Sequence, residues 1–334
     1  MHEVFLKRAI DIASKGKYLT KPNPMVGCVI VKDNEIIAEG FHMKYGSNHA
    51  EINALESLYK NNKILEKDYQ KLTLYCTLEP CCHHGKTGPC TDAIIKSGIK
   101  KVVIGIKDPN PKVAGSGIEQ LEKNGIQVIS GFFEEDLIKL NKYFFYKNTH
   151  KRPYVSIKMA SSSDGMSHRK DNKFTWITSE ESRDDVQVVR AEFDVIITGG
   201  NTLRNDNPKM NARVDFEVNQ PKKILLTSQP VDEKYNFFKT GDVKIERSND
   251  LNALIKELSN SEINSVLIEA GPKLVNAFLS KNLVDEVIVY KSKNKLGDEG
   301  VPWFKNKTIE SFGFDLKSTL QIKHDTKETY LRRT

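Results

Sequence analysis

One histidine, one glutamate and two cysteines in the first part of the chain have the types and spacing to bind and use a metal ion. His49 and Glu51 are two residues apart, and Cys81 and Cys90 follow further along the chain. One imidazole and two thiolates give zinc three protein ligands and leave a fourth position for water, as a catalytic site requires. Zinc lowers the pKa of that water, and a carboxylate that does not bind the metal can carry protons.

The spacing of these residues indicates which class of reaction the metal site would catalyse. Zinc-dependent nucleobase deaminases share His-x-Glu followed by Pro-Cys-x-x-Cys, and their zinc-activated water attacks an amino-bearing ring carbon. His49-Ala50-Glu51 matches the first half, but eight residues separate Cys81 from Cys90. A longer loop must therefore carry the third ligand. We expect His49, Cys81 and Cys90 to bind Zn²⁺, and Glu51 to pass protons to the departing ammonia.

Other ligands and a non-catalytic zinc site remain as alternatives. Three neighbours could compete for the metal: Cys82, His83 and His84. A residue next to a ligand usually points away from the metal, so we favour the first set. A structural zinc site, or a non-catalytic binding module stabilised by zinc, would keep the three ligands without needing Glu51. The presence of that carboxylate favours a catalytic site.

The candidate ligands lie on helices and strands that alternate along the first half of the chain. Apolar periodicity and turn signals predict strands at 27–31, 35–39, 72–76, 101–106 and 126–129, and helices at 50–59, 92–96 and 116–123. Asp33-Asn34 between the first two strands predicts a β-hairpin. This order indicates an α/β layer architecture in which the later strands are parallel.

A polar stretch ending in proline, residues 147–153, predicts a domain boundary. We expect one domain over residues 1–147 and a second over 148–334, each large enough for a core of its own. The alternation restarts after the boundary, with strands at 154–159, 195–198, 223–227 and 265–269 and a capping-box pattern at 178–181. No Gly-x-Gly-x-x-Gly follows a strand, which argues against a Rossmann domain.

Composition excludes several classes of protein. The 334 residues are 38% hydrophobic and 28% charged, as in globular proteins. The apolar runs are strand-sized and the N-terminus lacks a signal pattern, so we expect neither a membrane span nor secretion. The net charge of +7 is spread over isolated lysines, which favours a solvated surface over nucleic-acid binding. The five cysteines, all within the first 90 residues, indicate a reducing, cytoplasmic compartment.

Nine segments, in order along the chain, resemble the family of bifunctional riboflavin biosynthesis deaminase/reductases. In the first half they are 22–31, His49-Ala50-Glu51, 77–90 and 108–115. In the second half they are 158–165, Trp176-Ile177-Thr178, Arg190-Ala191, Asn205-Asp206-Asn207-Pro208 and Glu269-Ala270-Gly271-Pro272. The wide cysteine spacing is what that family shows. The resemblance covers nearly the whole chain.

The resemblance implies a fold and two successive reactions. The first domain would have a three-layer fold similar to cytidine deaminases, and would remove the 2-amino group of 2,5-diamino-6-ribosylamino-pyrimidinone 5'-phosphate. The second would have an α/β fold similar to dihydrofolate reductase, and would use NADPH to reduce the ribosyl side chain to ribityl. The partner would be a small phosphorylated pyrimidine, with no nucleic acid or membrane involved, and the chain is expected to form a homo-oligomer.

The resemblance also implies contacts for individual residues of the second domain. The positions that match nucleotide contacts are Ala160, Trp176, Thr202, Asp206, Ser228 and the turn from Gly271. Those that match substrate contacts are Arg190, Met210, Arg213 and Glu269. Taken alone, Gly271-Pro272 at a strand-to-helix turn could direct backbone N–H groups at a diphosphate, or could be an ordinary turn. The two arginines suit a phosphate through paired hydrogen bonds, although either could be a surface residue.

Two departures from the family and two further rival functions remain. Gly88 stands where the family has a proline in the zinc loop, which should only loosen that loop. Phe174 stands where the family has a small polar residue, which puts that substrate contact in doubt. A monofunctional deaminase or reductase with one decayed domain is one rival, although both motif sets are complete. A tRNA or nucleoside deaminase is the other, and it leaves the motifs of the second half without a role.

Overall fold

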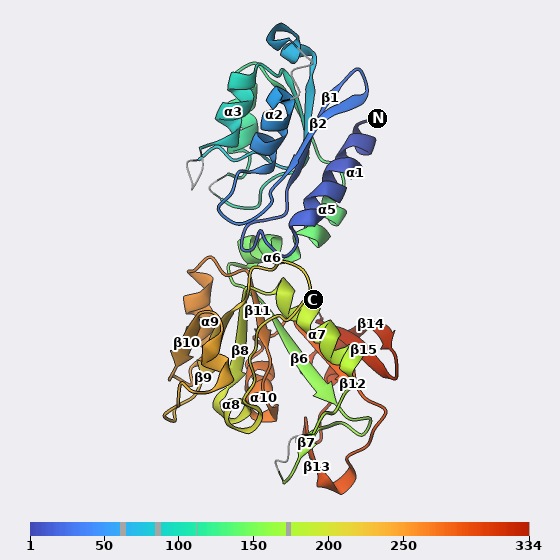
Figure 1. Cartoon of the computed structure of the whole chain (residues 1–334), viewed down its shortest axis with the longest axis vertical. Helices are drawn as coiled ribbons and strands as arrows, with labels where there is room; N and C mark the ends of the chain where they lie inside the picture. The colour runs from blue at the N-terminus through green and yellow to red at the C-terminus, as the bar shows by residue number, and fades with distance from the viewer. Residues whose placement is uncertain (61–64, 84–87, 112, 172–174, 334) are drawn as a thin grey trace. The chain divides into compact units, whose positions relative to one another are not determined.

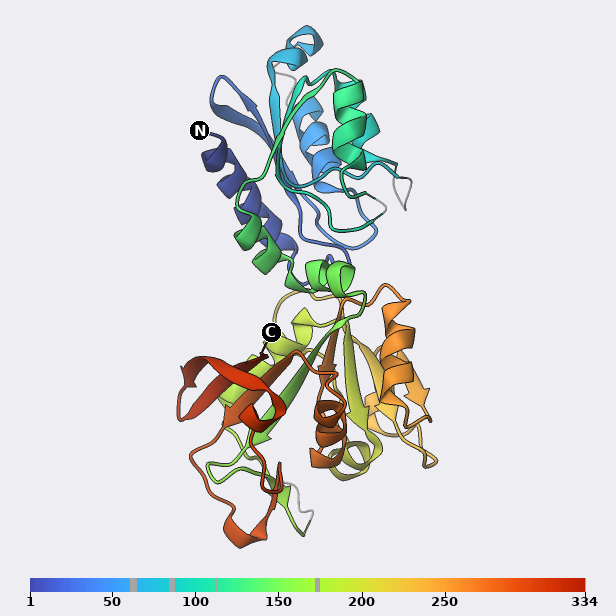
Figure 2. The ribbon, with the colours of Figure 1, turned by 180° about the vertical axis from the view of Figure 1, so that it is seen from behind.

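The chain folds into two compact units, residues 1–150 and 151–334. The computed structural model describes residues 1–60, 65–83, 88–111, 113–171 and 175–333, so His84 and Phe174 lie outside the described residues. Figures 1 and 2 show the chain from two opposite sides. The division falls after His150 rather than after Lys147, and helix α6 (Lys142–His150) extends into the polar stretch as far as that residue.

The first unit is built on one five-stranded sheet in the order β2-β1-β3-β4-β5. Its strands are β1 (Gly27–Lys32), β2 (Glu35–Phe41), β3 (Thr73–Leu78), β4 (Lys101–Ile106) and β5 (Gln127–Ser130). The hairpin of β1 and β2 is antiparallel, whereas β3, β4 and β5 are parallel. Asp33 and Asn34 both have positive φ, as the predicted two-residue turn requires.

Helices cover both faces of this sheet and give three layers. On one face α2 (Ala50–Lys60), α3 (Cys90–Ser97) and α4 (Ser116–Lys123) bury apolar side chains against the strands. On the other face lie α1 (His2–Ala13) and α5 (Glu134–Leu140). Gly40 allows α2 to pack directly on β2, because a Cβ at this position would lie 2.2 Å from the backbone nitrogen of Ala54. The predicted three-layer architecture of the first unit is confirmed.

The second unit contains an eight-stranded sheet in the order β10-β9-β8-β11-β6-β12-β15-β14. The strands from β10 to β12 are parallel and the last two are antiparallel. Their bounds are β6 (Tyr154–Ser161), β8 (Val195–Gly199), β9 (Lys222–Leu226), β10 (Val243–Glu246), β11 (Ser265–Ile268), β12 (Glu286–Lys291), β14 (Phe314–Ile322) and β15 (Asp325–Arg332). A separate two-stranded sheet pairs β7 (Met166–Arg169) with β13 (Gly300–Pro302).

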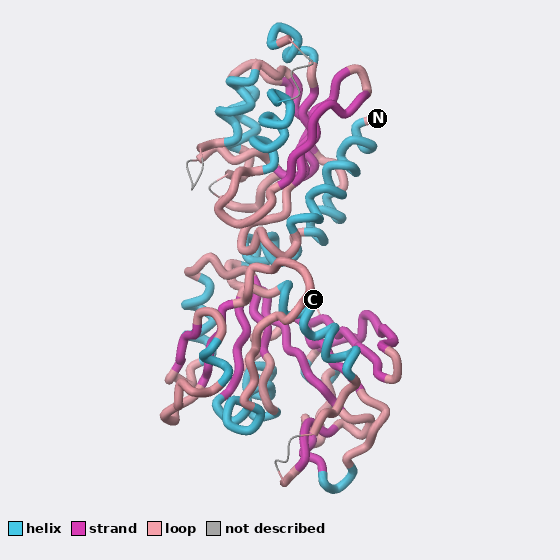
Figure 3. The backbone as a smooth tube through the Cα atoms, in the orientation of Figure 1, coloured by secondary structure: helices cyan, strands magenta, loops and turns pink. Residues whose placement is uncertain are grey.

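The α-helices that accompany this sheet, within the described residues, are α7 (Glu180–Glu192), α8 (Gly200–Asp206), α9 (Leu251–Ser259) and α10 (Pro272–Ser280). Ser179 caps α7 by accepting a hydrogen bond from the backbone of Ser182, so the cap lies one residue after the Thr178 expected from the capping-box pattern. Helices α9 and α10 bury their apolar residues in the main core. Figure 3 shows the alternation of strands and helices in both units. No helix among the described residues is long and apolar enough to cross a bilayer.

Candidate functional site

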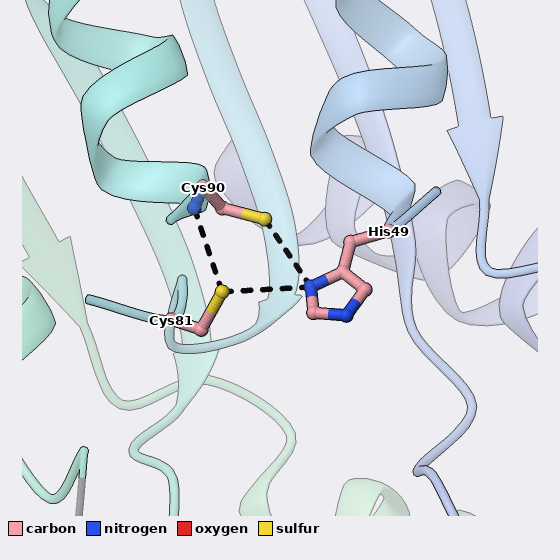
Figure 4. A group of neighbouring side chains, drawn as sticks. All are labelled: His49, Cys81 and Cys90. Carbon is pink, nitrogen blue, oxygen red and sulfur yellow. Dashed lines mark hydrogen bonds between the residues drawn. The ribbon is translucent and has the colours of Figure 1, made fainter. Parts of the chain in front are cut away.

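Three elements of the first unit bring a histidine and two cysteines together. His49 directly precedes α2, Cys81 follows β3, and Cys90 is the first residue of α3. Their ligand atoms all lie within 4.8 Å of one another. The Nδ1 atom of His49 lies 3.5 Å from Cys81 Sγ and 3.3 Å from Cys90 Sγ (Figure 4). The predicted ligand set is therefore assembled although the three residues are distant in sequence.

The donor set fits a zinc ion. A tetrahedral zinc with its usual bond lengths to nitrogen and sulfur holds an N···S pair about 3.6 Å apart, close to the two distances observed. The backbone N–H of Cys90 points at Cys81 Sγ from 3.4 Å. A hydrogen bond from Cys90, opposed by burial and helped by His49, lowers the pKa of the Cys81 thiol to about 4. A thiolate at this position is the form that binds a metal.

Glu51 lies on the first turn of α2 and is almost completely buried. Its carboxyl interacts with the Cys90 thiol, and burial raises its pKa to about 7. A buried carboxyl beside the ligands, but not one of them, has the position of a proton carrier. Among the described residues, the metal-binding group contains His49, Cys81 and Cys90, and neither Cys82 nor His83 belongs to it.

The buried His42 and the partly buried Asn23 form a polar pair beside the imidazole of His49. The ring of His42 meets that of His49 edge-on, with their centroids 5.4 Å apart. His42 Nδ1 lies 3.0 Å from the carbonyl of Asn48, and its Nε2 lies 3.1 Å from the side-chain nitrogen of Asn23. The amide nitrogen of Asn23 can only donate, so His42 Nε2 accepts and Nδ1 carries the hydrogen. The neutral tautomer of His42 thus fixes the orientation of the Asn23 amide.

The second unit contains a cavity of about 1520 Å³. All ten residues expected to contact nucleotide or substrate line it: Ala160, Trp176, Arg190, Thr202, Asp206, Met210, Arg213, Ser228, Glu269 and Gly271. Among the residues that line the cavity, nine are lysine or arginine and four are aspartate or glutamate. The volume exceeds that of a usual single-ligand pocket, and the excess of positive charge suits anionic ligands.

A buried ion cluster lies in this cavity. Glu269 accepts hydrogen bonds from Arg190 Nε at 2.6 Å and Nη2 at 2.9 Å, and Lys158 Nζ lies 2.9 Å from the same carboxylate. Burial alone would raise the pKa of Glu269, but the charges of Arg190 and Lys158 bring it down to about 2. Sequence reasoning did not predict Lys158 as a site residue. A lysine among the mostly buried residues of strand β6 is the signal that could have found it.

The two arginines predicted for the phosphate differ in their surroundings. Arg190 is buried, and its two-point pairing is made with Glu269, so those donors are not offered to a phosphate. Arg213 is exposed, and its guanidinium reaches Asn211 Oδ1 at 3.4 Å. Burial of part of the side chain, and then the neighbouring charge of Arg190, lower the pKa of Arg213. Arg213 therefore has the accessibility that an anion contact requires.

The remaining predicted residues form the walls of the cavity. Gly271 is the N-cap of α10, which begins with Pro272, so the N-terminus of this helix faces the cavity. Trp176 is 62% exposed and stacks against Arg183, whose guanidinium carbon lies 4.2 Å from the ring centroid. A helix N-terminus and an exposed indole are suited to a diphosphate and to an aromatic ring respectively.

Comparison with known proteins relates both sites to one family. The model described as "RibD C-terminal domain" matches residues 153–327, and that of the "cytidine and deoxycytidylate deaminase zinc-binding region" matches residues 1–106. The riboflavin biosynthesis protein RibD of Buchnera aphidicola is 37% identical over 98% of this chain and 100% of its own length. The chain belongs to the RibD family. RibD of Escherichia coli is 35% identical over 94% of this chain and 97% of its own.

Solved structures of RibD proteins have the same fold over their whole length. RibD of Acinetobacter baumannii has a TM-score of 0.90 at 35% identity, covering 100% of this chain and 99% of that one. A deaminase/reductase of Thermotoga maritima has a TM-score of 0.87 at 35% identity, covering 99% of each chain. As a member of the RibD family, this protein is a bifunctional deaminase and reductase of riboflavin biosynthesis that uses Zn²⁺ and NADPH. A monofunctional deaminase or reductase, or a non-catalytic module stabilised by zinc, is not favoured.

Proposed function

We propose that the first unit removes the 2-amino group of 2,5-diamino-6-ribosylamino-pyrimidinone 5'-phosphate, and that the second unit reduces the ribosyl group of the product to ribityl. The similar Thermotoga protein is named a diaminohydroxyphosphoribosylaminopyrimidine deaminase and 5-amino-6-(5-phosphoribosylamino)uracil reductase. The observation that carries the proposal is the presence of two complete sites in one chain: the His49, Cys81, Cys90 and Glu51 cluster and the cavity lined by all ten expected residues.

In the deaminase reaction, water replaces the amino group and ammonia leaves. His49, Cys81 and Cys90 would hold zinc, which when bound makes water acidic enough to supply hydroxide at neutral pH. Glu51 accepts the proton of the attacking water and donates it to the departing nitrogen, because it is buried beside the ligands without being one of them. We expect Asn23, whose amide is oriented by His42, to hydrogen-bond the edge of the pyrimidine ring.

In the reductase reaction, C1 of the opened ribose is reduced, and NADPH when bound would supply the hydride. The N-terminus of α10 at Gly271 would bind the diphosphate of the nucleotide, and Arg213 the phosphate of the substrate. Lys158 and Glu269 would hold the sugar, with Arg190 keeping the carboxylate of Glu269 in position. Opening of the ribose leaves C1 doubly bonded to the amino nitrogen, while the ring oxygen takes up the proton of that nitrogen. An ammonium paired with a carboxylate can donate the proton that this nitrogen needs when the hydride adds to C1.

The test is to supply the diamino-pyrimidinone phosphate with and without NADPH and to identify the products. Without NADPH we expect ammonia and the deaminated ribosylamino compound, and with NADPH the ribitylamino compound with one NADPH oxidised per molecule. Metal analysis should find about one zinc per chain, as three protein ligands and one water imply. Protein prepared without chelators that contains no zinc, or that releases no ammonia, contradicts the proposal.

The cellular compartment and the assembly belong to the same proposal. The five cysteines carry no disulfide, and two of them are the zinc ligands, which suits a reducing cytoplasm. We also propose that the chain forms a homo-oligomer. Light scattering coupled to size-exclusion chromatography checks this, and a mass equal to a single chain at micromolar concentration would contradict it.

A further inference from the structure

The long loop between Cys81 and Cys90, here called the cysteine loop, has to hold two zinc ligands at a fixed separation. Cys81 and Cys90 belong to different elements, and the eight residues between them include positions outside the described part of the chain. Two thiolates can share a zinc ion only if their sulfur atoms are held at the tetrahedral separation. Some part of the fold must therefore fix the two ends of this loop. Helix α4 contacts both.

Glu79, two residues before Cys81, binds the start of α4. Its carboxylate is buried and accepts four backbone hydrogen bonds of 3.0 to 3.2 Å, from the N–H groups of Asp108, Gly115, Gly117 and Ile118. Three of these groups belong to the N-cap and first turn of α4, where backbone N–H groups have no partner within the helix. A carboxylate at this helix end is also favoured by the helix dipole.

Gly117 brings the helix still closer to the ligand segment. A Cβ at Gly117 would lie 2.2 Å from the carbonyl oxygen of Pro80, the residue directly before Cys81. The first turn of α4 therefore packs on the backbone of the ligand segment itself, with no room for a side chain between them. The position of α4 and the position of Cys81 cannot change independently.

Gln120, on the next turn of α4, binds the other end of the loop. Its Oε1 accepts a hydrogen bond of 3.0 Å from the hydroxyl of Thr91, and its Nε2 donates one of 2.8 Å to Asp92. Thr91 directly follows Cys90 and is completely buried. The backbone N–H of Thr91 in turn donates to the carbonyl of Cys81 at 3.2 Å, so the two ends of the loop also contact each other.

We propose that Glu79 and Gln120 are positioning residues of the deaminase, which act through α4 to hold Cys81 and Cys90 at the separation that zinc requires. This inference rests on the proposed zinc deaminase site. Neither side chain is a member of the metal-binding group. Helix α4 lies at 116–123, beyond the matched zinc-binding region at residues 1–106. The cysteine loop is thus held by a part of the chain outside that region.

The test compares Glu79→Gln and Gln120→Met with Glu122→Gln. Glu79→Gln replaces one carboxylate oxygen by an NH₂ group that faces backbone donors, and Gln120→Met keeps the length but removes both hydrogen bonds. Glu122 is an exposed glutamate on the same helix, so its variant makes the same chemical change away from the contacts. Loss of a partner that orients a metal ligand costs about 10- to 100-fold in metal affinity or activity.

We expect both test variants to lose zinc to a competing chelator at about 10- to 100-fold lower chelator concentration than the wild type. The deamination kcat should fall with the zinc affinity while the KM stays nearly constant, and the Co²⁺-substituted variants should show a changed visible absorption spectrum. Oxidation of NADPH with deaminated substrate should stay normal, which reports that the second unit is folded. Glu122→Gln should match the wild type throughout.

Zinc affinity, cobalt spectrum and deamination rate unchanged in both test variants would overturn the inference. If Glu79→Gln prevents the first unit from folding, Gln120→Met decides alone, because it leaves the capped start of α4 intact. A wild-type protein that binds no zinc would instead overturn the proposed function. The two failures are therefore distinguishable.

Discussion

At the scale of single residues, Glu51 allows metal binding and catalysis to be separated. Glu51→Gln removes a proton carrier but no metal ligand, so deamination should fall to background while zinc content and NADPH-dependent reduction stay near wild type. Ammonia release, metal analysis and NADPH oxidation measure the three quantities. A variant that deaminates at close to the normal rate would show that another group carries the proton.

Arg213 should distinguish phosphorylated from unphosphorylated substrate. Charge-assisted hydrogen bonds contribute roughly 1.5–3 kcal/mol, so Arg213→Ala should weaken binding of the phosphorylated substrate about 10- to 100-fold. NADPH binding should hardly change. Calorimetric titration with both forms of the substrate checks this, and an unchanged preference for the phosphorylated form would remove Arg213 from the phosphate site.

The residues that gather at the two sites could be predicted from the sequence. The hydrogen-bond partners of those residues were harder to predict. His49, Cys81 and Cys90 come together as expected. They could be predicted because the sequence offers a metal few other soft ligands. The partner of Arg190 could not be found this way, since Glu269 lies 79 positions away in sequence. Pairing between distant segments depends on strand order, which local patterns do not encode.

At the scale of elements, the contact between α2 and β2 controls the position of His49. Gly40→Ala places a methyl group against the backbone of α2, and overpacking of this kind costs roughly 1–3 kcal/mol. We expect a lower midpoint of chemical unfolding for the first unit and weaker zinc binding. Gly88→Ala is the matched control for stability alone, because a Cβ there meets no atom of the described residues within 4 Å. Equal stability of the two variants would contradict the prediction.

Several elements with strong apolar periodicity or clear turn residues were predicted nearly to their ends. The hairpin at Asp33-Asn34 and the helix that stops at Gly98 are examples, since each has residues that fit a positive φ. Other elements were not predicted: helices α5, α6, α8 and α9 and strands β7, β10, β12 and β13. Helix α6 buries Phe145 and occupies the first part of the polar stretch that was expected to form the domain boundary. The antiparallel strands β14 and β15 were missed as well, because many side chains of β14 are exposed and show no apolar alternation.

At the scale of the whole molecule, each unit has its own sheet and core, so the two activities should be separable. A fragment of residues 151–334 should oxidise NADPH with deaminated substrate at a rate near that of the full chain, because every residue lining its cavity lies within the fragment. Removing zinc from the full chain with a chelator should stop deamination and leave this reduction unchanged. A folded fragment that binds neither ligand would contradict two self-contained units.

The division of one polypeptide after His150 has a consequence for the flow of material through the two reactions. Synthesis of each chain delivers one deaminase and one reductase, so their ratio is fixed at one to one and cannot drift with expression. The steady-state level of the deaminated intermediate then depends on the two sets of rate constants and on NADPH supply. A substitution that slows only the second unit should therefore make the intermediate accumulate, and the cell could not correct this by producing more of the enzyme.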